Sequence, residues 1–134
     1  MRMMKKIAIS CLMLAMLVGC QESLEDRAAR EVDEYTQKYC PVQVSDNTFL
    51  DSMTFDKQSH TLVNHFSIMT DSTSAQRAVE KADMIKSRLK EEVRNDTSKK
   101  RFKEEGYSFR FVARSYEDKS VILYDTTIKP EDYQ

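Results

Sequence analysis

Apolar residues recur at helical spacing in two segments of this chain and at strand spacing in four others, and this alternation restricts its fold more than any other feature. The first helical segment follows Ser23, which forms a capping box with Asp26. Pro41 ends the segment, because proline cannot continue a helix. Its apolar positions are Leu24, Ala28, Val32, Tyr35 and Tyr39. The pattern predicts a helix of about four turns.

A second helix is predicted after the capping residues Asp71–Ser74. Its apolar stripe comprises Ala75, Ala78, Ala82, Ile85, Leu89 and Val93, with charged residues between. Residues Asn95–Thr97 end this helix or begin a short helical turn that runs through Phe102. We expect Gly106 to close that turn, where the backbone needs a positive φ.

The strand-like segments form two predicted hairpins. The first joins Phe49–Phe55 to His60–Met69 around Lys57-Gln58. This places Phe49, Asp51, Met53 and Phe55 opposite Phe66, Asn64, Leu62 and His60. Asp51 and Asn64 interrupt the apolar face, so we expect them near a sheet edge or hydrogen-bonded to each other. A short additional strand over Val42–Val44 is the alternative to a plain connection there.

The second predicted hairpin joins Tyr107–Tyr116 to Val121–Ile128 around Asp118-Lys119. One face pairs Phe109, Phe111, Ala113 and Ser115 with Ile128, Thr126, Tyr124 and Ile122. The reverse face mixes aromatic, aliphatic and basic side chains, as interface hot spots do. We predict an interaction face there, formed by Arg110, Val112, Arg114, Tyr116, Val121 and Leu123. The alternative is that Val42–Val44 or the C-terminal tail covers it.

Together these elements predict the α+β class, with the order α-β-β-α-β-β. The expected architecture is a four-stranded antiparallel sheet, made of the two hairpins, with both helices on its apolar face. Only two glycines occur, which argues against a glycine-rich phosphate loop and against a β-sandwich with many turns.

The N-terminus reads as a secretory signal, with basic residues Arg2, Lys5 and Lys6 before the apolar run Ile7–Val18. It ends in Leu17-Val18-Gly19-Cys20, which resembles the lipobox of bacterial lipoproteins. That resemblance implies cleavage before a lipidated Cys20. It divides the chain into a signal peptide (1–19), a lipidated N-terminus with a short tether (20–23) and one α+β domain (24–134).

The resemblance also implies a location in the cell envelope, held to the membrane by lipid. Gln21 follows the lipidated cysteine, where an aspartate often retains lipoproteins in the inner membrane, so we favour the outer membrane. Which side of it the domain faces stays open. Residues 39–41 and 47–53 further resemble small secreted bacterial domains of uncharacterised function, and no functional residue is carried over from them.

Charge and cysteine content restrict the range of possible functions. Removing Arg2, Lys5 and Lys6 from the 21 basic residues leaves 18 against 22 acidic ones, a formal charge of −4. An acidic envelope domain is a poor candidate for binding nucleic acid. Cys40 is the one cysteine left after lipidation, so no disulfide forms within the domain. We expect it to be a buried small residue.

Known catalytic arrangements are missing from the sequence. Cys40 lies at the C-terminal end of a predicted helix, where the dipole disfavours a thiolate. His60 and His65 are an odd number of positions apart on a strand, so they point to opposite faces and are not expected to share a metal. The basic cluster Lys99–Lys103 either contacts anionic headgroups or is a solvated turn. We expect neither an enzyme nor a cofactor.

Three functions remain open. The favoured one is a non-enzymatic binding or adaptor domain that presents a sheet face to another envelope protein. The alternatives are an inhibitor or immunity-type lipoprotein directed at an envelope hydrolase, by fold-level analogy, and a carrier of a small apolar ligand. The sequence leaves the oligomeric state open.

Overall fold

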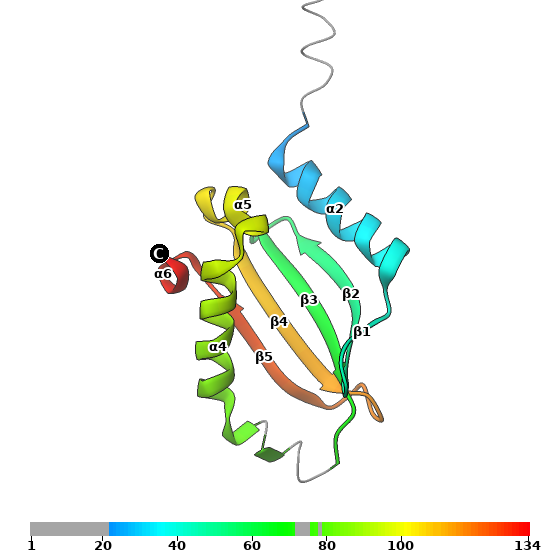
Figure 1. Cartoon of the computed structure of the whole chain (residues 1–134). Helices are drawn as coiled ribbons and strands as arrows, with labels where there is room; N and C mark the ends of the chain where they lie inside the picture. The colour runs from blue at the N-terminus through cyan, green and yellow to red at the C-terminus, as the bar shows by residue number, and fades with distance from the viewer. Residues whose placement is uncertain (1–21, 72–75, 78) are drawn as a thin grey trace, which may run out of the picture.

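A computed structural model describes residues 22–71, 76–77 and 79–134 (Figure 1). The predicted signal peptide and the predicted lipidation site at Cys20 lie outside the described residues. The helices are α2 (Leu24–Tyr39), α4 (Ala82–Asn95), the 3-10 turn η1 (Thr97–Lys99), α5 (Lys100–Glu104) and α6 (Pro130–Tyr133). The strands are β1 (Val42–Ser45), β2 (Thr48–Asp56), β3 (Thr61–Ile68), β4 (Ser108–Ser115) and β5 (Ile122–Ile128). The predicted α+β class is confirmed.

The strands form one five-stranded sheet in the order of the chain, β1-β2-β3-β4-β5. The predicted four-stranded antiparallel sheet is wrong in two respects. Val42–Ser45 forms a fifth strand at the edge, and β3 and β4 pair in parallel. The chain leaves β3 at one end of the sheet and returns through α4, η1 and α5 to the other end before β4 begins (Figure 1). Such a crossover makes two neighbouring strands parallel.

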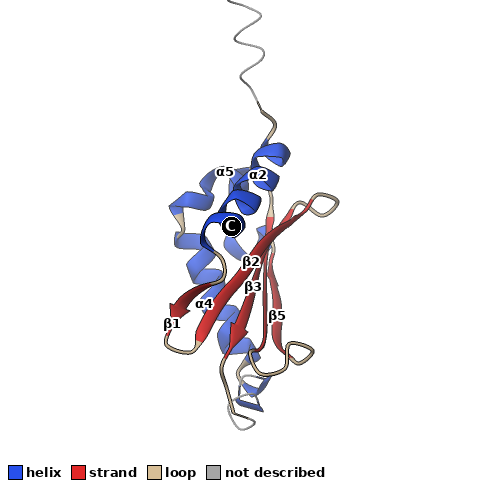
Figure 2. Ribbon diagram, turned by 90° about the vertical axis from the view of Figure 1, so that its right-hand side faces the viewer, coloured by secondary structure: helices blue, strands red, loops and turns tan. Residues whose placement is uncertain are grey.

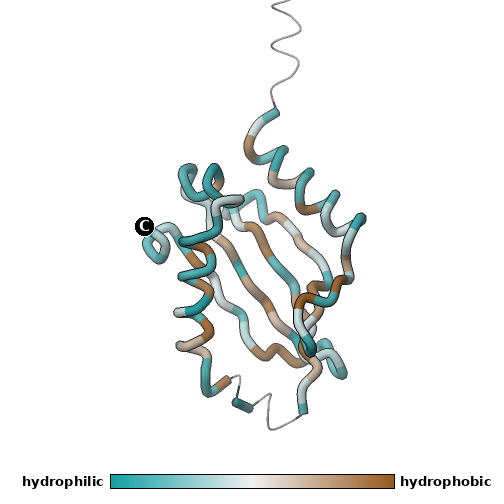
Figure 3. The backbone as a smooth tube through the Cα atoms, viewed as in Figure 1, coloured by the Kyte–Doolittle hydropathy of each residue, from teal (hydrophilic) through white to brown (hydrophobic). Residues whose placement is uncertain are grey.

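Both long helices lie on one face of the sheet, as predicted, and none of the described helices lies on the other face (Figure 2). Helix α2 packs on β2, and α4 packs on β5. The core between the layers consists of Ala28, Leu89, Val93, Phe102, Tyr107, Phe109, Phe111, Ile128 and Tyr133. Hydrophobic residues recur along the strands of the sheet (Figure 3).

Helix α2 begins and ends as its sequence predicts. The Ser23 Oγ accepts a 3.1 Å hydrogen bond from the Asp26 amide, and the Cys40 amide donates to the Thr36 carbonyl. The Thr36 hydroxyl also accepts from the Met53 amide at 2.8 Å and donates to its carbonyl, which fastens the helix to β2.

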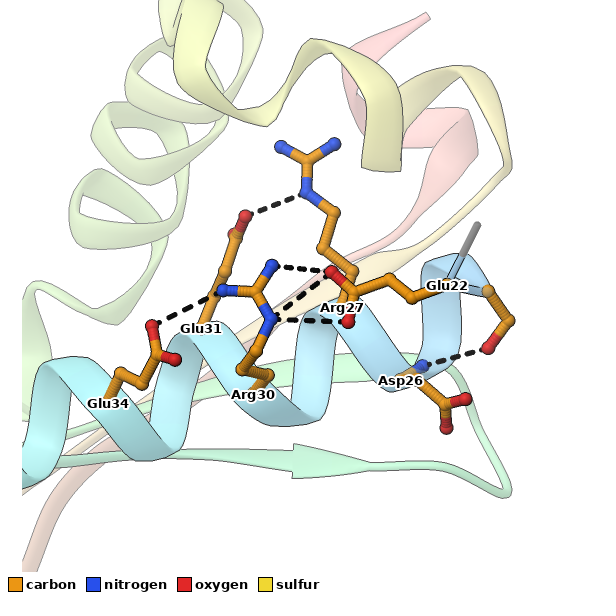
Figure 4. A network of polar contacts seen from close by, with 7 residues as sticks. Glu22, Asp26, Arg27, Arg30, Glu31 and Glu34 are labelled. Atoms are coloured by element: carbon orange, nitrogen blue, oxygen red, sulfur yellow. Dashed lines mark hydrogen bonds and ion pairs between the residues drawn. The ribbon is translucent and has the colours of Figure 1, made fainter. Parts of the chain in front are cut away.

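Ion pairs join side chains along α2 (Figure 4). Arg30 contacts both Glu22 and Glu34, and Arg27 pairs with Glu31 at 2.7 Å. The hydrogen bond from Arg30 lowers the pKa of the Glu22 carboxyl. These pairs hold Glu22 against the helix, two residues after the predicted lipidation site.

The predicted register of the first hairpin is wrong: Phe55 pairs with Leu62 and Met53 with Asn64, each two residues beyond the predicted partner, because the turn spans residues 57–60. A β-bulge between Leu50 and Ser52 then shifts the pairing by one residue. Leu50 pairs with Phe66, whereas the sequence placed Phe49 there. One extra residue in a strand moves the preceding side chains to the opposite face. Leu50 therefore enters the core, and Asp51 turns to the helix-free face, where Ser67 donates a hydrogen bond to it. The predicted contact between Asp51 and Asn64 is wrong.

The second hairpin follows its predicted register from Phe109↔Ile128 to Ala113↔Tyr124. A bulge after Ala113 then pairs Arg114 with Ile122, so the predicted pair of Ser115 and Ile122 is wrong. The turn before β4 is confirmed: Gly106 has a φ of 75°, and the Tyr107 amide donates to the Phe102 carbonyl, closing α5.

Candidate binding groove

The helix-bearing face of β3 forms the floor of an open groove. Leu62, Asn64, Phe66 and Ile68 occupy alternate positions of the strand and are half-buried. From Leu62 to Ile68 this row spans about 20 Å at the usual rise of a strand. We call the depression above these four residues the β3 groove. Apart from Asn64, its floor is apolar.

Helix α2 and α5 enclose one end of the β3 groove, which we call the Phe102 end. The cavity there has a volume of about 350 Å³. Val32 and Tyr35 line it from α2, and Phe102 lines it from α5. Most residues of this lining are apolar. Its two charged members form ion pairs within the chain, Glu31 with Arg27 and Lys99 with Asp96.

Helix α4 and strand β1 enclose the other end, which we call the Arg88 end. The cavity there has a volume of about 470 Å³. Ile85, Arg88 and Leu89 line it from α4, and Val44 lines it from β1. Phe66 and Phe111 form the floor between these walls. Both cavities lie along the same strand, since Leu62 and Asn64 line one and Phe66 and Ile68 line the other.

The groove is open because the helices cover the flanks of the sheet and leave its centre free. Helix α2 lies over β2 and α4 over β5, with β3 and β4 visible between them (Figure 1). Large apolar side chains remain exposed on the walls: Tyr35 is 38% and Val44 52% exposed. An apolar depression rimmed by polar residues marks a binding surface on a folded protein.

Polar contacts brace the α2 wall near the Phe102 end. The His60 ring lies 2.8 Å from the Glu25 carboxylate and stacks on Tyr107, with ring centroids 5.0 Å apart. The hydrogen bond from His60 lowers the pKa of the Glu25 carboxyl. The Arg27 guanidinium lies 5.6 Å from the centre of the Phe102 ring, which joins α2 to α5.

The opposite wall is braced by the basic cluster Lys99–Lys103. Burial raises the pKa of the Asp96 carboxyl, but hydrogen bonds from Lys99 and Ser98 outweigh it and lower that pKa to about 2. Lys103 donates to the carbonyl oxygens of Val93 and Arg94, which ends α4. Lys99 and Lys103 therefore serve internal contacts, which favours the solvated-turn interpretation over contact with headgroups.

The predicted interaction face is only partly assembled in the structure. Arg110 makes two hydrogen bonds to Asp125, at 2.8 and 2.6 Å, on the helix-free face. Val112 lies beneath neighbouring side chains and is 1% exposed. The bulge in β5 turns Leu123 towards α4, and it is 4% exposed. Arg114 is half-buried, while Tyr116 and Val121 are exposed. The role of this face stays a prediction.

The two histidines and Cys40 lie apart. His60 faces the helix layer, whereas the His65 ring contacts the Thr54 hydroxyl on the helix-free face at 2.9 Å. Burial and the charge of Asp51 raise the pKa of the half-buried Cys40 thiol. Within the described residues, no three His, Cys, Asp or Glu side chains converge on a possible metal position. No helix among them has the length and apolar character needed to cross a membrane.

The sequence interpretation missed the β3 groove, because it assumed that two helices cover the whole apolar face. One signal was available. The apolar stripe of α2 is narrow, and its last members Tyr35 and Tyr39 are aromatic residues with polar tips, which suit a half-exposed position.

Residues 23–124 match the model of a protein family described as a domain of unknown function (DUF8479). The chain belongs to this family. The matched range extends from the cap of α2 to Tyr124 in β5, so it contains both walls and the floor of the β3 groove.

Two solved structures have the same fold. A protein from Pseudomonas aeruginosa described as secreted has a TM-score of 0.66 and 15% sequence identity, covering 85% of this chain and 100% of that one. A pilotin from the type 2 secretion system of Vibrio vulnificus has a TM-score of 0.60 and 16% identity, covering 83% of this chain and 92% of that one. No curated protein sequence matches the chain. At these identities the likeness shows the fold alone.

Proposed function

We propose that this protein is a non-enzymatic adaptor of the cell envelope, which binds an amphipathic helix of another envelope protein in the β3 groove. The observation that carries the proposal is the half-exposed apolar floor between two helical walls. Lipid on Cys20 would hold the domain at the membrane. Gln21 favours the outer membrane.

The groove dimensions favour a helix over an extended peptide. A floor of about 20 Å accommodates about 13 helical residues, or between three and four turns. The apolar side chains point up from the middle of the sheet, where every strand edge is already paired. An added strand would need a free edge, whereas a helix buries its apolar face directly on such a floor.

The comparisons support an envelope role. One structural neighbour belongs to a type 2 secretion system, and the other is described as secreted. Both agree with the signal segment and the lipobox-like Leu17-Val18-Gly19-Cys20 of this chain.

Site-specific photo-crosslinking in cells tests the proposal. A photoreactive residue would replace Asn64 in the groove floor, and a control would replace Thr127 on the helix-free face. We expect one envelope protein to crosslink at Asn64 alone, through a segment with apolar residues at helical spacing. Equal crosslinking at both positions, or none at Asn64, would contradict the proposal. The Cys20→Ala form tests whether capture depends on the anchor.

A small apolar ligand is the second candidate, because the Phe102 end has the size and apolar lining of a ligand cavity. A ligand present at one hundred times its dissociation constant raises the free energy of unfolding by about 2.7 kcal/mol. Thermal denaturation with fatty acids and phospholipids measures this. Stabilisation that the substitution Val32→Gln abolishes would favour the ligand over the helix.

A further inference from the structure

The Arg88 end of the β3 groove continues into a depression that carries positive charge. Its volume is about 290 Å³, and it shares Ile68, Ile85 and Arg88 with the groove. Its lining consists of Asn47, Ile68, Thr70, Arg77, Lys81, Met84, Ile85, Arg88 and Leu123. This lining contains three basic side chains and no acidic one. We call it the basic pocket.

The three cations of the basic pocket have no acidic partner among the described residues of its lining. Within the described part of the chain, Arg77, Lys81 and Arg88 form no ion pair. Most other arginines do: Arg27, Arg30, Arg94, Arg101 and Arg110 each contact a carboxylate within 4.0 Å. Three positive charges without an ion pair therefore lie together in the basic pocket, directly beside the apolar floor of the β3 groove.

The two ends of the groove thus differ in charge. At the Phe102 end, Glu31 and Lys99 are each paired within the chain. At the Arg88 end, Glu92 is the acidic residue of the lining, and the basic pocket beyond it has none. A bound segment with carboxylates at one end should place that end near the basic pocket. Opposite charges attract more strongly near a partly desolvated surface, so this direction of binding is favoured over the reverse.

We propose that the basic pocket binds acidic side chains at the C-terminal end of the helix held in the β3 groove. The last carbonyl groups of a helix carry a partial negative charge, so this end suits the three cations better than the N-terminal end. The pocket then fixes the direction of the bound helix. This inference rests on the proposed function.

Defined peptides test the inference with the full domain. Three helical peptides share one apolar stripe and differ in a Glu-Glu-Glu block at the C-terminal end, the same block at the N-terminal end, or glutamines at both ends. Fluorescence anisotropy measures their dissociation constants. We expect the first peptide to bind at least about tenfold more tightly than the other two, and this preference to weaken with added salt.

Variants separate the pocket from the groove. Substituting Arg77 and Lys81 by glutamine should weaken the preference and leave the glutamine peptide unaffected, because these two residues line the basic pocket and not the groove. The matched control substitutes Lys86 and Lys100 by glutamine, which removes the same charge elsewhere and should change nothing. Equal binding of all three peptides would contradict the inference about the basic pocket but would agree with binding of a helix in the β3 groove. Binding of none of them overturns both.

Discussion

The two sides of strand β3 contrast in an unexpected way. The side without a covering helix is mostly closed: Thr61, Val63 and Ser67 are 7%, 5% and 0% exposed, and His65 is half-buried. The side under the helices is open, since Leu62, Phe66 and Ile68 are only half-buried. A helix layer on a sheet therefore does not by itself bury the sheet's centre.

The reason lies in side-chain size. On the helix-free face, small residues of β3 pair with long neighbours, Val63 with Arg110 and Ser67 with Arg114. The aliphatic stems of long charged side chains can bury small neighbouring residues. On the other face the cover must come from α2 and α4, and these lie over the flanking strands. The two faces therefore differ in how the sheet is covered, and four predictions test this difference.

The largest effect is expected in the core that the helices do close. Replacing Phe109, which is 1% exposed, by alanine should lower the free energy of unfolding by about 3–5 kcal/mol. Phe66→Ala in the groove floor should cost clearly less, since part of that ring remains in water. Urea denaturation measures both. Equal losses would show that the groove floor is as closed as the core.

Ser67→Ala should produce the next largest effect. The fully buried Ser67 hydroxyl donates to the Asp51 carboxylate, and removing the donor leaves that carboxylate with one partner fewer. We expect a loss of about 1–3 kcal/mol in thermal denaturation. Ser52→Ala on the same face is the control, since Ser52 makes no side-chain hydrogen bond to another described residue. Similar losses for the two variants would disprove the role of this contact.

The helix-free face should also lose stability in mild acid. Burial, and then the charges of Arg114 and Arg110, lower the pKa of His65 below its ordinary value of 6.5. The unfolded chain takes up this proton first as the pH falls, so stability is complete above about pH 6.5 and declines below it. His65→Gln should flatten that decline. A variant with the same pH profile as the parent would assign the decline to another group.

The smallest effect is expected for Arg114→Ala combined with Tyr116→Ala. Tyr116 is 48% exposed, and its ring lies tilted against that of Phe49 with the centroids 5.4 Å apart, so we expect a loss of about 1 kcal/mol or less. Crosslinking from Asn64 should persist if the groove alone binds the partner. Lost crosslinking by a folded double variant would place the predicted interaction face in the interface as well.

Local features were predictable from the sequence because they depend on neighbouring residues. The cap at Ser23, the end of α2 before Pro41 and the positive φ of Gly106 each follow from one or two side chains. The register of β4 with β5 follows from alternation over a short turn, up to the bulge.

Tertiary structure decided the rest, because the remaining choices depend on contacts between distant segments. The parallel pairing of β3 and β4 depends on the path of the crossover between them. The bulge at Asp51 depends on Leu50 reaching the core and Asp51 reaching Ser67. Alternation along β3 shows which residues face the helices. Only the packing of α2 on β2 and α4 on β5 decides that these residues remain accessible and form a groove.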